Sequence, residues 1–430
     1  MKVAVIGAGF GGLAAAHDLA GAGCQVTVFE ADGNVGGLSS GFKASGWDWS
    51  VERYYHHWFA SDRYMLGLID ELGWREKVLF PRPLTVIYHQ EAFHPLDSPI
   101  AAIRFPAFNL MDIARFGLVT LYLKLSPNWR PLERHTADAW LRRWYGERVY
   151  KIVWQPLLEG KFGPHYREVN AAWFWARVHA RTPRLGTFVG GFQAFADALA
   201  ERVKGEGAML RLNTPVKTIE TTPEGGLRLG LPEGGEEFDQ CLATVSPAML
   251  ARMAPALETG YLEKLRALKS MGAVVMVLAL KHRLSEQGFY WHNLPKAAGF
   301  PFLAMVEHTN FLSPERFGGD HIVYCGDYLD PSHEYFSLSQ EQLLERFLPS
   351  LPRFNPRFKP DWVRRSWLFR TKYAQPVPMV HQSQAIPTLR TPMPGLWFAS
   401  MSQVYPWDRG TNFAVEIARR AARGMLRERD

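Results

Sequence analysis

The chain has 430 residues, too many for one hydrophobic core, so its length predicts two or three domains. Its composition, 47% hydrophobic and 21% charged residues, is typical of a globular protein. The formal charge of +7 comes from scattered arginines and lysines without a nucleic-acid-binding motif, and nucleic-acid binding is therefore excluded.

Two further classes are excluded by pattern. No window of about 20 apolar residues occurs, which argues against a transmembrane helix. Cys24, Cys241 and Cys325 lie far apart, so we expect buried thiols in a reducing, cytoplasmic setting rather than disulfides. No secretory signal peptide is expected either, because residues 2–6 are needed as a strand.

The first predicted elements form a strand–turn–helix–strand unit. Residues 2–6 are a short apolar run that predicts a buried parallel strand. Gly7-Ala8-Gly9-Phe10-Gly11-Gly12 follows, and an alanine-rich helix continues to Leu19. A second strand, 26–29, ends at Glu30.

Each residue type in this unit has a mechanical reason. Gly7 permits a tight turn, Gly9 lets a pyrophosphate approach the backbone, and Gly12 lets the helix pack closely on the strand. The helix N-terminus offers unpaired N–H groups to phosphates. Glu30 is placed to accept hydrogen bonds from ribose hydroxyls, which predicts a dinucleotide without a 2′-phosphate and excludes NADP at this site.

A second glycine pair, Gly36-Gly37, followed by Leu38-Ser39-Ser40, comes six residues after Glu30. The run from Val3 to Ser40 resembles the extended FAD fingerprint of the flavoprotein superfamily that includes flavin amine oxidases, protoporphyrinogen oxidase, phytoene desaturases and UDP-galactopyranose mutase. The resemblance implies that the glycine pair contacts the pyrophosphate and ribityl region. Leu38 replaces the arginine usual after the pair.

The resemblance also implies further cofactor contacts. An Asn213-Thr214-Pro215-Val216 segment resembles the one whose valine holds the adenine, and a terminal helix after Tyr405 to Thr411 resembles the one that faces the ribityl chain and the flavin N1–C2 edge. The full set of expected FAD contacts is Gly7, Gly9, Phe10, Gly11, Gly12, Glu30, Ala31, Gly36, Gly37, Leu38, Ser39, Val216, Asp408, Thr411 and Asn412.

The same layout predicts the fold class. We expect an α/β protein in which a Rossmann-like FAD-binding domain, with a parallel sheet and a three-stranded meander, carries an inserted α+β substrate domain. The expected FAD-binding segments are 1–64, 189–249 and 386–430, and the substrate domain takes 65–188 and 250–385. Within the latter we expect a helix from 136 to 158 and strands at 274–280 and 322–328.

Three segments are candidates for the substrate side. Tyr55-His56-His57 lies where family members pass near the flavin ring, and His57, then His56, are the predicted proton-handling groups; two adjacent histidines without further ligands do not predict a metal site. Glu307 and His308 belong to a polar cluster that would line the pocket or cap a turn. Tyr373 and Gln375 resemble the aromatic-plus-proline segment placed over the flavin, although a structural role is equally open.

Two absences narrow the chemistry. The strand 272–276 lacks the lysine that flavin amine oxidases carry there, and Ser402-Gln403-Val404 stands where those enzymes have a flavin-linked cysteine. A simple primary-amine oxidase is therefore disfavoured. The missing cysteine predicts noncovalent FAD.

Residues 100–125 combine an apolar helical stripe (Leu110, Ile113, Gly117, Leu121, Tyr122) with interspersed basic residues. Such a helix would lie in a membrane surface and admit a lipid-like substrate, or it would pack on its own domain. The first alternative makes the protein a peripheral one at the inner face of the membrane.

These observations lead to one preferred hypothesis and two alternatives. The preferred one is an oxidase or desaturase that transfers hydride to flavin N5 from a large hydrophobic substrate such as an isoprenoid or a tetrapyrrole, with oxygen or a quinone as electron acceptor. The alternatives are an isomerase like UDP-galactopyranose mutase, for which Arg364 and Arg365 would supply diphosphate contacts, and a non-catalytic flavin-binding partner protein.

Overall fold

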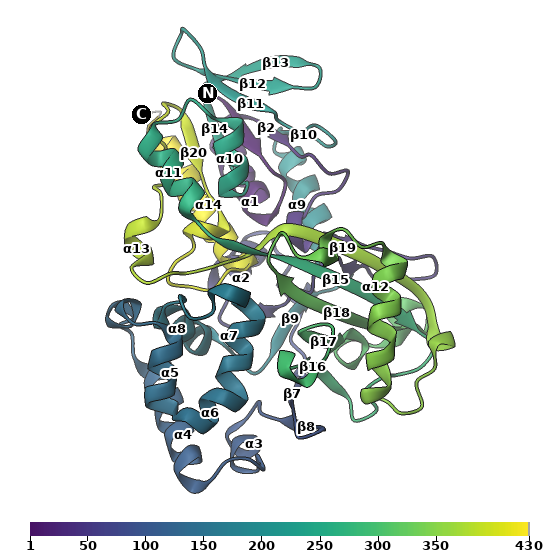
Figure 1. Cartoon of the computed structure of the whole chain (residues 1–430). Coiled ribbons are helices and arrows are strands. Elements are labelled where there is room, and N and C mark those ends of the chain that lie inside the picture. Colours follow the sequence, from purple (N-terminus) through teal and green to yellow (C-terminus); the bar gives the residue numbers. More distant parts are fainter. Residues whose placement is uncertain (429–430) are drawn as a thin grey trace.

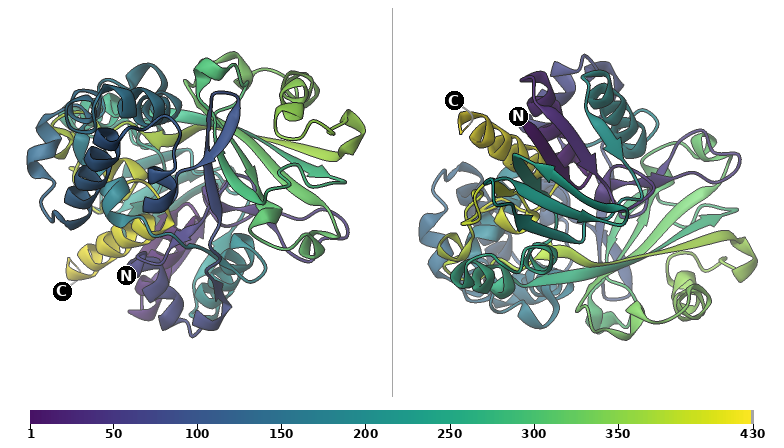
Figure 2. Two further views of the ribbon diagram at one scale, coloured as in Figure 1. Left: turned by 90° about the horizontal axis from the view of Figure 1, so that it is seen from below. Right: turned by 90° about the horizontal axis from the view of Figure 1, so that it is seen from above.

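The computed structural model describes residues 1–428, which form three connected blocks (Figure 1). One block contains a parallel sheet covered by helices and includes both the first strand and the last helix. The second block is a large mixed sheet, and the third is a group of helices. Figures 1 and 2 show the mixed sheet and the helical group side by side, both against the same side of the first block.

A five-stranded parallel sheet forms the centre of the first block. Its neighbouring strands all run parallel, in the order β10-β2-β1-β14-β20. Strands buried on both faces are continuous apolar runs, which is why this sheet was visible in the sequence. The strands are β1 (Lys2–Ile6), β2 (Gln25–Phe29), β10 (Met209–Arg211), β14 (Gln240–Ala243) and β20 (Leu396–Phe398).

The two faces of this sheet pack against different elements, because successive side chains of a strand point to opposite sides. Val3 and Val5 pack with three helices, while Ala4 and Ile6 pack with two further helices and a meander. The predicted α/β class with its three-stranded meander is confirmed. These elements are α1 (Phe10–Gly21), α9 (Phe192–Gly205) and α14 (Thr411–Arg427) on the first face, and α10 (Pro247–Met253), α11 (Thr259–Ala267), β11 (Thr218–Thr221), β12 (Leu227–Leu231) and β13 (Gly234–Phe238) on the second.

The second block is a seven-stranded sheet in the order β19-β15-β18-β17-β16-β7-β8. All its pairs are antiparallel except β16 with β7. The strands expected at 274–280 and 322–328 lie within β15 and β18. The bounds are β7 (Leu84–His89), β8 (Ala92–Pro95), β15 (Ser270–Leu280), β16 (Phe289–Asn293), β17 (Ala304–Glu307), β18 (His321–Leu329) and β19 (Val363–Pro376), with α12 (Gln340–Phe347) on one face.

The helical block corrects one expectation. Instead of one helix over 136–158, the chain forms α5, a break at Gly146, the short α6, a π-helical stretch at Tyr150–Trp154 and then α7. Gly146 has φ +88°, a conformation that a right-handed helix cannot contain. The bounds are α3 (Pro99–Ile103), α4 (Leu110–Leu125), α5 (Ala137–Tyr145), α6 (Glu147–Val149), α7 (Gln155–Phe162) and α8 (Ala171–Ala180).

Short elements connect the blocks. They are α2 (Arg63–Glu71), α13 (Gln382–Ala385), β3 (Gly41–Phe42), β4 (Val51–Glu52), β5 (Trp58–Phe59), β6 (Val78–Leu79) and β9 (Leu185–Phe188). Within residues 1–428, no helix has the length and apolar character needed to cross a membrane. Cys24, Cys241 and Cys325 are buried and free. The exact division of the chain into two domains stays a prediction.

The start of α1 lies unusually close to the end of β1. A Cβ atom added to Gly12 would lie 1.9 Å from the carbonyl oxygen of Gly7. Because both groups belong to the backbone of packed elements, neither can move aside cheaply. Gly12 is therefore required by the contact between strand and helix.

We predict that Gly12→Ala lowers the free energy of unfolding by about 1–3 kcal/mol, the usual cost of overpacking. Urea denaturation followed by tryptophan fluorescence measures this change. Gly21→Ala is the matched control on the same helix, because a Cβ there meets nothing within 4 Å. Equal stabilities of the two variants would contradict the argument.

Candidate functional site

The predicted dinucleotide turn begins where β1 ends. Gly7 has φ +102°, and Gly9 is the N-cap residue of α1 in extended conformation. The first turn of a helix leaves its N–H groups without intrahelical acceptors. Phe10 itself packs against Phe192 and Phe195, with ring centroids 6.2 and 5.1 Å away, so its contribution to a ligand is limited to the backbone.

Glu30 ties the loop after β2 to this turn. Its carboxylate accepts hydrogen bonds from the N–H of Ala8 at 2.7 Å and of Asp32 at 2.9 Å. A carboxylate has about four acceptor sites, so ribose hydroxyls can still donate to it. Ala31 beside it is exposed, as the contact expected from the sequence requires.

The second glycine pair meets the first glycine loop directly. The N–H of Gly36 donates to the carbonyl of Ala8 at 2.8 Å, and Gly36 pairs with Gly9 as a parallel β-bridge. Gly36 and Gly37 have φ of +106° and +58°, and a Cβ on Gly37 would lie 3.2 Å from the Cα of Gly9. The narrow gap between the loops is therefore lined by backbone.

The residues beyond the pair lie around the same loop. Leu38 is half-buried, and Ser39 is buried with its N–H donating to the carbonyl of Gly36. The guanidinium of Arg53 lies 2.6 Å from Asp32. It brings a positive charge to the region in which Leu38 replaces the usual arginine.

The N-terminus of α14 is fastened to the segment that carries the two histidines. Thr411 accepts a hydrogen bond from the indole N–H of Trp58 at 2.9 Å, and the Asn412 side chain accepts from the N–H groups of Tyr64 and Met65. Both side chains act as acceptors in these bonds, so the Thr411 hydroxyl proton, the Asn412 amide NH2 and the backbone groups remain as donors for a cofactor. Val216 is half-buried against the core around the meander.

His56 and His57 are both held neutral. Burial, and then the charge of Arg409, lower the pKa of His56 to about 4, and its Nδ1–H donates to the carbonyl of Tyr54 at 2.6 Å. Burial, followed by the charge of Arg181, places the pKa of His57 well below its ordinary value. The Nδ1 atom of His57 is buried and has no partner within residues 1–428.

Asp408 lies in a cluster of basic residues. Its carboxylate is 3.3 Å from Nζ of Lys161 and 3.9 Å from Arg177. Burial alone would raise the pKa of Asp408, but Lys161, Arg409 and Arg177 together lower it far below its ordinary value. Gln375, only 1% exposed, donates to Asp408 and accepts hydrogen bonds from Lys161 and Arg409, both at 2.9 Å.

The other predicted substrate contacts have structural partners. The Tyr373 hydroxyl bonds to Ser400 and Ser402, each at 2.8 Å. Glu307 is fully buried and accepts hydrogen bonds from the N–H groups of Leu284 and Ser285 at 2.9 and 2.5 Å. A substrate role for either residue stays a prediction.

His308 is packed next to Glu307 among aromatic rings. Burial lowers the pKa of His308 to about 4, and its ring lies 5.9 Å from Tyr324. Tyr324 in turn contacts Tyr55 at 5.9 Å. His308 is thus one ring away from the Tyr55–His57 segment, and its role toward substrate stays a prediction.

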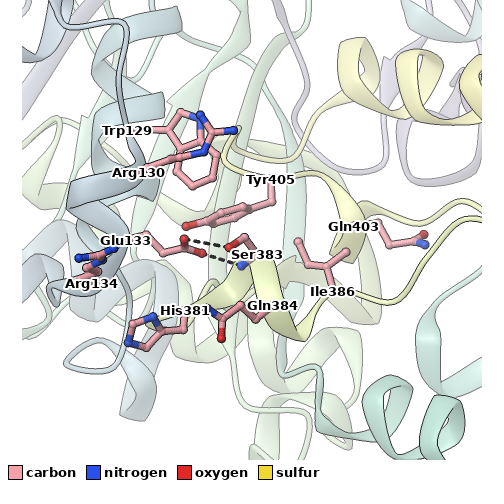
Figure 3. A pocket seen from close by; sticks show the side chains of 10 residues that line it. All are labelled: Trp129, Arg130, Glu133, Arg134, His381, Ser383, Gln384, Ile386, Gln403 and Tyr405. Carbon is pink, nitrogen blue, oxygen red and sulfur yellow. Dashed lines mark hydrogen bonds between the residues drawn. The ribbon is translucent and has the colours of Figure 1, made fainter.

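Two cavities border this region. The larger, of about 550 Å³, opens between residues 129–134 and 381–386, and its acid Glu133 already accepts hydrogen bonds from Ser383 (Figure 3). None of the site residues predicted from the sequence is among its lining residues. The smaller, of about 20 Å³, is lined in part by Gln375, Asp408 and Arg409 and so belongs to the predicted site.

The basic residues around Asp408 were missed by sequence reasoning. Lys161 is in the last turn of α7, Arg177 is on α8, and Arg181 directly follows the last residue of α8. The available signal was the i, i+4 spacing of Arg177 and Arg181 beside an apolar run that ends in Ala176.

Comparison with known proteins identifies the family. The model of the flavin containing amine oxidoreductase family matches residues 10–426. The chain belongs to this family. The membership predicted from the glycine motifs is confirmed, and a flavin is the cofactor of this family.

Individual relatives match over smaller parts or at lower identity. Protoporphyrinogen oxidase 2 of Arabidopsis thaliana is 44% identical over 167 residues, which cover 37% of this chain and 32% of the relative. The carotenoid phi-ring synthase of Streptomyces griseus is 24% identical over 281 residues, covering 59% and 54%. The chain thus spans about a third to a half of these relatives. The structure of reduced UDP-galactopyranose mutase has a TM-score of 0.76 at 15% identity and covers 99% and 96% of the two chains.

The residues of this flavin amine oxidoreductase fit FAD. The loops of Gly9 and Gly37 meet without intervening side chains and both glycines are accessible, so a pyrophosphate can approach their backbone, and Glu30 keeps acceptor capacity for a ribose. The hydroxyl of Ser402, in the segment where the sequence lacks the expected cysteine, bonds to Tyr373. Noncovalent binding of FAD stays a prediction.

The buried carboxyl group of Glu52 makes the stability of the folded protein depend on pH. Burial raises the pKa of Glu52 to about 7, although the carboxylate accepts a hydrogen bond from the N–H of Phe192 at 3.0 Å. The folded state therefore binds this proton more tightly than the unfolded state. Its contribution to stability is present at low pH and is lost as the pH rises from about 5 to 8.

We predict that Glu52→Gln becomes more stable relative to the unchanged protein as the pH rises from 5 to 8, because the amide oxygen keeps the hydrogen bond and never ionises. Melting temperatures measured at each pH with saturating FAD test this. Glu220→Gln, at an exposed position, is the control and should show a constant difference. A pH-independent difference for Glu52→Gln would refute the expectation.

Proposed function

We propose that this flavin amine oxidoreductase is an oxidase or desaturase of a large hydrophobic substrate, such as a tetrapyrrole or an isoprenoid. When bound, FAD supplies the hydride acceptor at N5. Oxygen or a quinone is the proposed electron acceptor. The names of the two sequence relatives, a protoporphyrinogen oxidase and a carotenoid phi-ring synthase, support these two substrate classes.

The observation that carries the proposal is a row of half-buried aromatic rings. Each ring contacts the next in the order Phe59, His57, Tyr55 and Trp291. The distances between successive ring centroids are 5.0, 5.4 and 4.9 Å. None of the four is fully buried, so their faces are available to a flat or extended apolar molecule. A small polar amine would leave most of this surface unused.

His57 is the proposed proton acceptor. Burial and the charges of the neighbouring arginines place its pKa far below 6.5, so the imidazole is neutral at physiological pH, and a substrate anion that offsets those charges would strengthen it as a base. The unpartnered Nδ1 atom leaves a free hydrogen-bonding position. His56, fixed by its bond to Tyr54, positions the segment.

The mutase-like alternative is supported by the likeness in fold to the mutase structure. Its proposed diphosphate contacts, however, are engaged elsewhere. Arg364 and Arg365 lie 2.9 and 2.8 Å from the buried carboxylate of Asp320. The non-catalytic alternative has no specific structural support beyond the fold.

Flavin absorbance recorded without oxygen separates these functions. We expect a reduced tetrapyrrole or a polyene precursor to bleach the oxidised flavin, while NADPH does not. Bleaching by NADPH alone would favour the mutase or a reductase, and bleaching by neither would favour the non-catalytic alternative.

His57→Ala should slow substrate-driven bleaching by about 10²–10⁴-fold, the usual contribution of a general base. Stopped-flow absorbance measures the rate. His282→Ala, at an exposed position, is the control and should leave the rate unchanged. An unaltered rate in His57→Ala would remove His57 from the mechanism.

We also propose that the helical block contacts a membrane surface. Of the apolar stripe, Leu110, Leu121 and Tyr122 are 86%, 53% and 53% exposed instead of packing on their own domain. Phe105, by contrast, is buried. The remaining exposed apolar side chains of this surface are Ile100, Ile103, Met111, Leu118, Leu125 and Trp144.

Charge indicates which surface this patch fits. Arg104, Arg115 and Lys124 are exposed around it. Asp112, the sole acid between residues 98 and 132, is buried and caps α4 by accepting from the Asn109 N–H. An apolar face bordered by basic residues of its own segment complements an anionic lipid leaflet. In Figure 1, α3 and α4 lie at the end of the molecule farthest from the parallel sheet.

We predict that the protein sediments with vesicles containing phosphatidylglycerol and that Leu110→Ser with Leu118→Ser reduces the bound fraction at least tenfold, because both leucines lose their apolar contact with the acyl chains. Met209→Ser, an exposed methionine on β10, is the control. Unchanged sedimentation of the double variant would refute membrane contact through α4.

A further inference from the structure

Four basic side chains lie around the predicted substrate site, and only two of them pair with a carboxylate. Lys161, Arg177, Arg181 and Arg409 come from α7, α8, the segment after α8 and the loop before α14. Asp408 pairs with Lys161 at 3.3 Å and more loosely with Arg177 at 3.9 Å.

The remaining positive charges have no acidic partner. The Arg409 guanidinium donates to the amide oxygen of Gln375 and to the hydroxyl of Tyr328, both neutral groups. Among residues 1–428 the Arg181 guanidinium forms neither a hydrogen bond nor a salt bridge, and the charge of Asp97 acts on it only weakly. The cluster therefore carries an excess of positive charge.

This excess is costly in a desolvated site. Burial lowers the pKa of Lys161 to about 7, with Asp408 opposing and the arginines reinforcing the effect. Like charges are thus held together although each disfavours the others, which is typical of a site completed by a ligand of opposite charge.

The cluster faces the proposed reaction centre. The charges of Arg181, Arg177 and Arg409 all act on His57, whose buried Nδ1 atom has no partner within the described residues. Arg181 is exposed, whereas Arg177 is about a quarter exposed, so the cluster extends from solvent to the interior.

We infer that the substrate carries an acidic group, a carboxylate or a phosphate, which Arg177 and Arg181 bind beside His57. The inference rests on the proposed function and narrows its substrate class. An uncharged polyene would leave the two arginines without a counter-charge. A tetrapyrrole with carboxylate side chains or an isoprenoid ending in a phosphate would supply one, and the planar guanidinium forks suit either group.

Binding to the oxidised holoprotein tests this without requiring turnover. The probes are protoporphyrin IX against its dimethyl ester, and farnesyl diphosphate against farnesol, measured by perturbation of the flavin spectrum. We expect at least one acid to bind at least tenfold more tightly than its neutral counterpart. The pair that shows the preference distinguishes carboxylate from phosphate, and equal binding within both pairs would overturn the inference.

The variants assign the preference to residues. Arg177→Gln with Arg181→Gln should abolish it, Arg177→Lys should retain part of it, and Arg252→Gln, an exposed arginine on α10, should leave it intact. The flavin reduction potential is recorded in parallel. If the double variant shifts only the potential and keeps the preference for the acid, the arginines serve the cofactor and the inference fails. A third outcome separates the two proposals. If the acid binds more tightly than its neutral counterpart but no substrate reduces the flavin, the anion site is supported and the proposed function is rejected.

Discussion

The contact between Gly12 and the carbonyl of Gly7 is the constraint on which the cofactor site depends. It lets α1 begin directly at the end of β1, so that the unpaired N–H groups of the helix face the loop formed by Gly36 and Gly37. Glu30 then closes the loop from the side of β2 through Ala8. The site is made largely of backbone. Its shape depends on the glycines, because a side chain at these positions would fill the space between the two loops and the helix.

The site also depends on hydrogen bonds between segments that are far apart in the sequence. Thr411 and Asn412 hold Trp58, Tyr64 and Met65, and they thereby place the histidine segment against the start of α14. The mixed sheet adds Trp291 of β16 to the aromatic row, and the helical block adds Lys161 and Arg177 to the basic cluster. The proposed substrate site thus combines residues of the histidine segment with residues from the other two blocks.

Much of the cofactor side could be predicted from the sequence, because its rules are local. Gly7 to Gly12, Glu30 and the meander turns each require particular backbone conformations within a few residues. The basic cluster could not be found in this way, since Lys161, Arg177, Gln375 and Asp408 meet across about 250 residues of sequence. Glu307 shows another limit of the sequence. A polar cluster in apolar sequence suits a pocket or a cap, and the N–H groups of Leu284 and Ser285 that bond to the Glu307 carboxylate come from a loop more than 20 residues earlier. The break at Gly146 was missed because one glycine inside a helical pattern is often tolerated.

The bond from Trp58 to Thr411 has a consequence for biosynthesis. It joins residues 353 positions apart, and β20 and α14 complete the same block. While the polypeptide emerges from the ribosome, β1, β2 and α1 therefore remain incompletely packed until β20 and α14 have been synthesised. Contacts of such sequence separation form slowly and leave apolar surface uncovered in the meantime. The nascent protein is thus expected to depend on chaperones until nearly the whole chain has been translated, and to take up its flavin only afterwards.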